Sequence, residues 1–239
     1  MINPFKYIFL YLIGSYCFYE GTTYNYFCGS EDWCEKGKHL MCDSSEIKSK
    51  GTFKHHVPPT FKVRRLILEQ HNNIRNNVAK ENSATRMRNL IWDHELAFLA
   101  RTHTGLCPDK PSVCHKTARF EKVGHNTASK DGERHITLST LMTTAFSEWQ
   151  AKESAAFKVL AHDQISRVGC AIGYCVDCTG GKKHCYFVSC FYDMDHKEGV
   201  EIHIKGTEAA SKCNVWDSVK DEKYTSLCHN TGKIFNIKT

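Results

Sequence analysis

Apolar side chains return every three or four positions in three stretches of the chain, residues 63–78, 96–103 and 136–149. This is the period of an α-helix that buries one face. The three stretches therefore predict three amphipathic helices. Asp93 stands just before the second stretch, and aspartate is a residue type that caps helix N-termini, so we expect it to begin that helix.

The pattern changes in the second half of the chain. Residues 168–172, 185–192 and 200–204 are short runs rich in β-branched and aromatic side chains, and turn residues bound them. Such runs predict β-strands. Gly180 and Gly181 lie between the first two runs, so we expect them at the tip of a hairpin. Helices followed by strands within one core predict the α+β class, with helices and sheet packed as layers.

The first eighteen residues have the pattern of a secretory signal peptide. Lys6 is followed by an apolar run over residues 7–13 and then by small residues. The run is far shorter than the roughly 20 apolar residues that span a bilayer, so we expect no transmembrane span. We place the cleavage after Cys17, with Gly21 as the second possibility; a buried N-terminal helix is the alternative interpretation. The sequence thus predicts a secreted, extracellular protein.

Outside the signal peptide the chain divides by composition. We expect a cysteine-rich, loop-rich N-terminal segment over residues 18–60, a core domain over 61–206 and a disulfide-closed polar tail over 207–239, after a signal peptide over 1–17. The composition of the 239 residues, 41% hydrophobic and 24% charged, excludes a disordered chain and a membrane bundle. The net charge of +6 is spread along the chain without a Lys/Arg block, so we expect no nucleic-acid partner. We also expect the protein to be a monomer.

Thirteen cysteines are present, and twelve remain once the signal peptide with Cys17 is removed. An even number of cysteines in an oxidising compartment predicts up to six disulfides. Cys175-x-x-Cys178 also fits zinc or redox chemistry by its spacing. A single such pair, without a second one, is weak support for either alternative.

Several strings resemble the CAP superfamily, the SCP domain shared by cysteine-rich secretory proteins, antigen 5 and plant pathogenesis-related proteins. They are LEQHNNIR at residues 68–75, MRNLIWDHELA at 87–97, VGHN at 123–126 and RVGCA at 167–171. The cysteine patterns near both ends of the chain are most similar to insect antigen 5. The resemblance covers nearly the whole chain after the signal peptide. It implies an α-β-α sandwich, with a three- or four-stranded antiparallel sheet between helical layers.

The resemblance also implies a set of disulfides. Four pairs follow the family pattern: Cys28–Cys42, Cys34–Cys114, Cys170–Cys190 and Cys213–Cys228. The N-terminal cysteine that usually pairs with the position of Cys107 is missing here. We therefore expect Cys107 to pair with one of three further cysteines, while the other two close the hairpin, with Cys178–Cys185 preferred; the three are Cys175, Cys178 and Cys185.

Many CAP domains carry two His and two Glu in a central cleft, and in some members this set binds zinc. The resemblance assigns these four positions, residue by residue, to Pro111, His125, Lys152 and Ala156; Glu153 could replace Lys152 only if the register slips by one. Proline and alanine have no ligand atoms in their side chains, and lysine brings a competing positive charge. We therefore expect no catalytic site, no cofactor and no metal in this cleft.

Other histidines offer weaker alternatives. His71, in the string HNNIR, is expected to anchor its helix through a hydrogen bond, while His103, His125 and His162 could form a replacement site. No G-x-S-x-G string occurs, and Cys–His catalysis would need a free thiol.

The sequence therefore predicts a secreted, non-enzymatic antigen 5-like protein. It would act by binding a partner that the sequence does not identify, either a protein or a small hydrophobe or lipid. The alternative is a secreted hydrolase or metal-dependent enzyme that uses a non-standard site.

Overall fold

The computed structural model describes residues 27–28, 34–35, 38–112, 114–132, 134–151 and 154–235. The expected signal peptide, its cleavage site and Lys152 lie outside these residues, as does Glu153. Among the described helices, none has a stretch apolar and long enough to cross a lipid bilayer.

A twisted antiparallel sheet forms the centre of the molecule. Its strands are β1 (Thr52–His56), β3 (Gly124–Asp131), β4 (Arg167–Cys178) and β5 (Lys182–Tyr192), in the order β1-β4-β5-β3. The two-residue β2 (Ile91–Trp92) pairs with β4 in parallel. The two strands of the long β4–β5 hairpin lie at the centre of the sheet.

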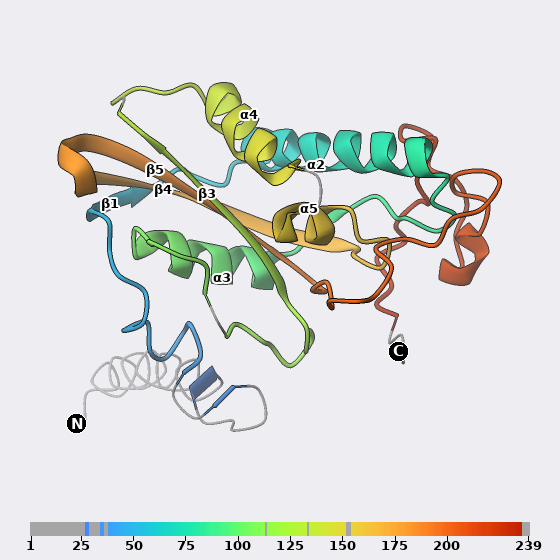
Figure 1. Cartoon of the computed structure of the whole chain (residues 1–239), viewed down its shortest axis with the longest axis horizontal. Coiled ribbons are helices and arrows are strands. Elements are labelled where there is room, and N and C mark those ends of the chain that lie inside the picture. Colours follow the sequence, from blue (N-terminus) through green and yellow to red (C-terminus); the bar gives the residue numbers. More distant parts are fainter. Residues whose placement is uncertain are drawn as a thin grey trace, which may run out of the picture.

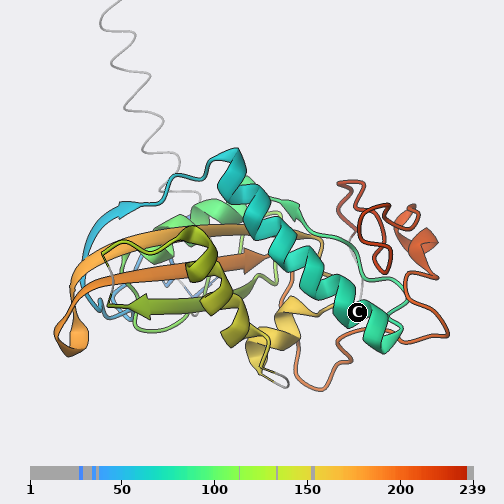
Figure 2. The same cartoon turned by 90° about the horizontal axis from the view of Figure 1, so that it is seen from above.

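Helices cover both faces of the sheet (Figures 1 and 2). α2 (Phe61–Asn82) and α4 (Leu138–Trp149) lie on one face, and the short α5 (Ala155–Leu160) joins the same core. α3 (His94–Gly105) covers the other face. The molecule is thus an α-β-α sandwich of the α+β class, as the sequence predicted.

Large side chains fill the space between the sheet and the α2–α4 layer. Phe146 and Trp149 of α4 pack with Tyr192 of β5 in the main hydrophobic core. The Trp149 indole N–H donates a hydrogen bond to the Thr127 carbonyl at 3.0 Å, so its one polar group is also satisfied. This face is therefore held mainly by buried apolar surface.

The α3 face is built differently, because the helix lies almost on the strand. A Cβ added to Gly169 would stand 2.0 Å from the backbone nitrogen of Ala97, and one added to Gly173 would stand 2.5 Å from the carbonyl oxygen of Thr104. Only glycine permits such an approach. A smaller apolar cluster around Leu96, Leu99 and Phe191 completes this face.

Six disulfides join the twelve cysteines. The pairs are Cys28–Cys42, Cys34–Cys114, Cys107–Cys175, Cys170–Cys190, Cys178–Cys185 and Cys213–Cys228. Four of these are the pairs that the family pattern implied, Cys178–Cys185 is the preferred closure of the hairpin, and Cys175 is the partner that Cys107 takes among the three candidates. The Cys107–Cys175 bond ties the loop after α3 to β4.

The three predicted helices are present as α2, α3 and α4. Asp93 caps α3, since its carboxylate accepts hydrogen bonds from the N–H groups of Glu95 and Leu96 at 3.0 and 3.3 Å. Gly180 and Gly181 form the hairpin tip with φ of 75° and 73°, a left-handed conformation that glycine adopts without strain.

The strand predicted at residues 200–204 is wrong. In the structure this segment runs beside the loop between α5 and β4. The Ile204 N–H donates to the Asp163 carboxylate, and the Asp163 N–H donates to the Ile202 carbonyl. Hydrogen bonds between this segment and Asp163 thus replace the regular strand pairing that the run of apolar residues predicted.

The sequence also missed β1, β3 and α5. The strand β3 reads GHNTASKD, which has neither the β-branched residues nor the clean alternation that marked the other strands. It nevertheless pairs with β5 over its whole length, from Gly124 with Tyr192 to Asp131 with Cys185.

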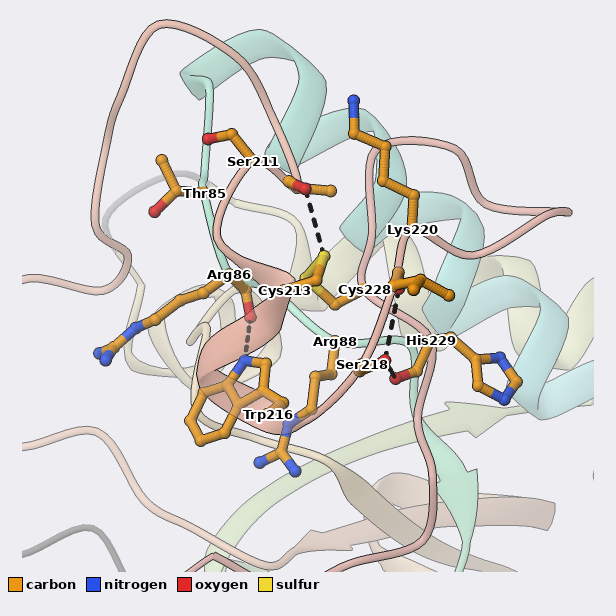
Figure 3. Close-up of a disulfide and its surroundings, with 12 residues drawn as sticks. Thr85, Arg86, Arg88, Ser211, Cys213, Trp216, Ser218, Lys220, Cys228 and His229 are labelled. Carbon is orange, nitrogen blue, oxygen red and sulfur yellow. Dashed lines mark hydrogen bonds between the residues drawn. A yellow bond between two sulfur atoms is a disulfide. The ribbon is translucent and has the colours of Figure 1, made fainter.

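The C-terminal tail folds back onto the segment before β2, and the Cys213–Cys228 disulfide closes it (Figure 3). The Trp216 indole N–H donates to the Arg86 carbonyl at 2.6 Å, and the Arg88 guanidinium lies 4.0 Å from the centre of the Trp216 ring. A cation over an indole is a favourable contact, so the tail is packed onto the core.

Candidate functional site

A cleft of about 530 Å³ opens beside β3 and α5. Such a volume fits a small organic ligand. The residues that form its walls and rim include Pro111, Ser112, His115, His125, Val159 and Asp195.

Two histidines, His115 and His125, form an aromatic wall of this cleft, and the buried rings of His103 and Phe191 lie behind it. His125 of β3 stacks on Phe191 of β5, its direct partner across the sheet, with ring centres 4.0 Å apart and planes 12° apart. The edge of His103 meets His125 at 4.5 Å, and the His115 ring lies 5.5 Å from His125. The pairing of β3 with β5 therefore places His125, and α3 supplies His103.

Hydrogen bonds fix the orientation of these imidazoles. One ring N–H of His103 donates to the Lys110 carbonyl at 3.0 Å, while the other nitrogen contacts the Ser189 hydroxyl at 2.7 Å. His115 Nε2 donates to the Val123 carbonyl at 2.8 Å. His125 Nδ1 accepts from the Ser112 backbone N–H at 3.3 Å. Four of the six ring nitrogens thus serve contacts within the protein.

Burial keeps the three rings uncharged near neutral pH. It lowers the pKa of His103 and of His115 to about 4, and it lowers the pKa of His125 well below its usual range. Neighbouring imidazoles lower the pKa of His125 further, since two positive charges side by side repel. The wall therefore offers neutral aromatic surface to a ligand.

The structure brings most of the assigned cleft positions to this place. Pro111 and His125 both line the cleft, and Ala156 follows the lining residue Ala155. The Ala156 carbonyl accepts a hydrogen bond from the Asn126 side chain at 3.0 Å. Lys152 lies outside the described residues.

Of the three histidines expected as a replacement site, His103 and His125 are in contact. The His162 ring lies 5.8 Å from that of His196, which also lines the cleft, and its Nδ1 lies 4.0 Å from the Asp163 carboxylate. Sequence reasoning missed His115, which completes the wall. Its one signal is its place directly after Cys114, whose disulfide with Cys34 fixes that loop.

Among the described residues, the one close group of three metal-binding side chains is His71, Cys170 and Cys190. The two cysteines form a disulfide, so they have no thiolate for a metal. His71 donates to the Ile67 carbonyl at 2.8 Å and contacts the Tyr192 hydroxyl at 3.0 Å. This is the helix-anchoring role expected for His71, since it joins α2 to β5.

A hydroxyl–imidazole pair, Ser189 with His103, stands behind the cleft wall. Both side chains have 0% exposed surface, so a substrate does not reach the hydroxyl. Ser112, which lines the cleft, has its hydroxyl 3.4 Å from the Cys114 carbonyl, to which it donates. The lining described here thus lacks an accessible nucleophile activated by a base.

Comparison with known proteins identifies the fold and its relatives. The family model described as "Cysteine-rich secretory protein family" matches residues 68–192. The chain is 26% identical over 234 residues to "Venom allergen-1" of Aedes albopictus, covering 87% of this chain and 89% of that protein. It is 30% identical over 139 residues to "Antigen 5 like allergen Cul n 1" of Culicoides nubeculosus, covering 48% and 64%.

The structure is similar to the solved structure titled "Crystal Structure of Hookworm Platelet Inhibitor". The TM-score is 0.55 at 19% sequence identity, covering 79% of this chain and 98% of that chain. At this identity the similarity concerns the fold, and it matches the α-β-α arrangement described above.

Proposed function

The chain belongs to the cysteine-rich secretory protein (CAP) family, and we propose that it is a secreted, non-enzymatic antigen 5-like protein that acts by binding. Its cleft takes a small hydrophobic or lipid ligand, and its outer surface takes a partner protein. The observation that carries the proposal is the uncharged cleft wall of His115 and His125, in which His125 stacks on the buried Phe191.

The replaced positions support binding over catalysis. Pro111 and Ala156 offer no side-chain ligand atoms, and Lys152 adds a positive charge by its residue type. His125 stands at a position where the family often has glutamate, and it packs face to face on Phe191. A flat, neutral surface of this kind favours apolar and aromatic ligands.

The disulfides support an extracellular place of action. Six disulfides in one chain are typical of proteins from oxidising compartments. The similarity to insect venom allergens points to the same compartment.

Mass spectrometry of the secreted protein tests the binding role. In the denatured, unreduced state we expect the mass to show two hydrogens lost for each of the six disulfides. In the native state we expect an organic adduct that dissociates on denaturation. Ala155→Trp, which fills the cleft from an exposed rim position, should lose the adduct, and Ala151→Trp, exposed but outside the cleft lining, should keep it.

The alternative class, a metal-dependent or hydrolytic enzyme, predicts other results. One stoichiometric zinc in the native protein would contradict the proposal. So would an esterase or peptidase activity that His115→Ala abolishes.

A further inference from the structure

A second hollow lies at the edge of the sheet, between the start of α2, α3 and β4. Its walls are mostly apolar and include Pro59, Val63, Trp92, Ala97, Ile172 and the stem of Arg101. Its cavity volume is about 50 Å³, which is several times what one water molecule needs but too little for a lipid chain. We call it the edge pocket. It matches the size of one apolar side chain.

Two aromatic side chains stand exposed next to residues of the edge pocket. Phe61, which begins α2 two residues before Val63, is 71% exposed. Phe98, which follows Ala97 in α3, is 46% exposed. Neither ring lines the pocket, but both stand exposed on helices that contribute to its lining, and a few exposed aromatic residues often supply most of the binding energy at protein–protein contact sites.

Positive charge lies at and beside the edge pocket: Arg101 lines it, and Lys62 and Arg64 flank its lining residue Val63 in the first turn of α2; we call these three side chains the cationic rim. The first turn of α2 has no acidic residue, although the positive end of the helix dipole favours one there. In the described part of the chain, Lys62, Arg64 and Arg101 pair with no carboxylate. The Nε of Arg64 is buried without a hydrogen-bond acceptor. Helix dipole and side chains thus attract an anionic partner.

We propose that the edge pocket and its cationic rim bind an acidic segment of a partner protein, which inserts one aliphatic or aromatic side chain. This proposal rests on the binding role above and names the chemistry of the protein partner. The carboxylates of the segment pair with Arg64 and Arg101, while its anchor side chain lies against Trp92 and Val63. The concave shape and the small volume favour a peptide anchor over a lipid surface.

Trp92 provides a readout of occupancy, because it lines the pocket and is partly exposed, whereas the other tryptophans that the structure describes, Trp149 and Trp216, are buried. The variant Trp92→Phe separates its signal from that of the remaining tryptophans. The full secreted protein is titrated with the capped peptide Asp-Asp-Phe-Asp-Asp and with its Ala counterpart. Burying a large apolar side chain gives about 1.5 kcal/mol or more, so the Phe peptide should bind about tenfold tighter or better. We expect a saturable change in Trp92 fluorescence, absent in Trp92→Phe.

Charge-reversal variants locate the contact. Arg64→Glu combined with Arg101→Glu should abolish peptide binding. Lys182→Glu combined with Lys183→Glu, which places the same change at the exposed hairpin tip, should leave it intact. Calorimetry on Trp92→Phe provides a second reading of affinity that does not use the fluorescence of this residue.

Three results would overturn the proposal. The first is the absence of a saturable signal, and the second is equal affinity for the Phe and Ala peptides. The third is binding to phosphatidylserine vesicles without binding to either peptide, which would assign the surface to membranes. The cleft variant Ala155→Trp should not change peptide affinity. If the unmutated native protein carries no organic adduct but still binds the peptide, the cleft ligand alone is rejected.

Discussion

On the α2–α4 face large side chains fill the gap between helix and sheet, whereas on the α3 face the helix lies directly on the strand. The first arrangement buries Phe146, Trp149 and Tyr192 in one core. The second depends on Gly169 and Gly173, and on the Cys107–Cys175 disulfide that ties the loop after α3 to β4. Packing holds one face, and close backbone contact with cross-links holds the other.

The cleft lies beside the edge strand β3, and α5 contributes Ala155 and Val159 to its lining. His125 of β3 stacks there on the buried Phe191, which pairs with Gly169 across the sheet. The covalent bonds stabilise this region without filling it, so a hollow can persist there.

Trp149→Ala should show the largest effect, because it removes the biggest side chain of the packed face. A cavity of this kind costs about 3–5 kcal/mol in the free energy of unfolding. Chemical denaturation monitored by far-UV circular dichroism measures it, with the exposed Val219→Ala as control. A loss below that of the control would contradict the importance of packing on this face.

Gly169→Ala tests the close approach on the other face. The new Cβ would meet only backbone atoms of α3, the nearest at 2.0 Å, so the helix must move as a unit. We expect a loss of about 3 kcal/mol, the upper end for overpacking. Thermal unfolding measures the loss. Gly132→Ala is the control. Its new Cβ would meet no atom, but its φ of 108° strains an alanine, so it measures backbone strain without a clash.

The stability lost on removing a disulfide should increase with the length of the loop that the disulfide closes. Replacing both Cys107 and Cys175 with Ser opens a loop with a sequence separation of 68 residues and should cost about 2–4 kcal/mol. The same change at Cys178 and Cys185, with a separation of 7, should cost less. Denaturant midpoints of the two double variants test this order, and the reverse order would contradict it.

The smallest effect concerns pH and the neutral histidines. His103 has its pKa lowered to about 4 by burial, so between about pH 6.5 and 4 the unfolded chain binds a proton that the folded chain does not. Stability is therefore full above that window and falls as the pH drops through it. His103→Gln should remove up to about 1.4 kcal/mol per pH unit from this slope.

Unfolding free energies measured from pH 7 to pH 4 test the change in slope. His71→Gln is the matched variant on the packed face, since burial lowers the pKa of His71 to about 3. It should reduce the slope by a similar amount. An unchanged slope in His103→Gln would mean that the pKa of His103 is the same in the folded and the unfolded chain, which would contradict the account.

The sequence predicted those elements that have a periodic apolar stripe or a continuous apolar run. The helices α2 and α4 have clear apolar stripes, and the β4–β5 hairpin has apolar runs around Gly180 and Gly181. The strand β3 has no such signal. Its Asn126 is buried, and the side-chain amide nitrogen donates hydrogen bonds to the Ala156 carbonyl and the Tyr192 hydroxyl, so a polar residue occupies a core position.

The cleft could be predicted in part. The family resemblance located Pro111, His125 and Ala156, but no spacing rule connects His115 with His103. They meet because the loop that carries His115 is tied by Cys34–Cys114, while β3 presents His125 between them. Such a contact depends on tertiary structure and leaves no periodic pattern in the chain.

The central claim is that an apolar ligand occupies the cleft beside a neutral histidine wall. Imidazole NMR of the secreted protein during titration with anilinonaphthalene sulfonate, a small aromatic hydrophobe, tests it most directly. We predict saturable shifts at His115 and His125, while His71, buried on the packed face, keeps its resonances. No shift at His115 and His125, or shifts at them only after zinc is added, would contradict the account.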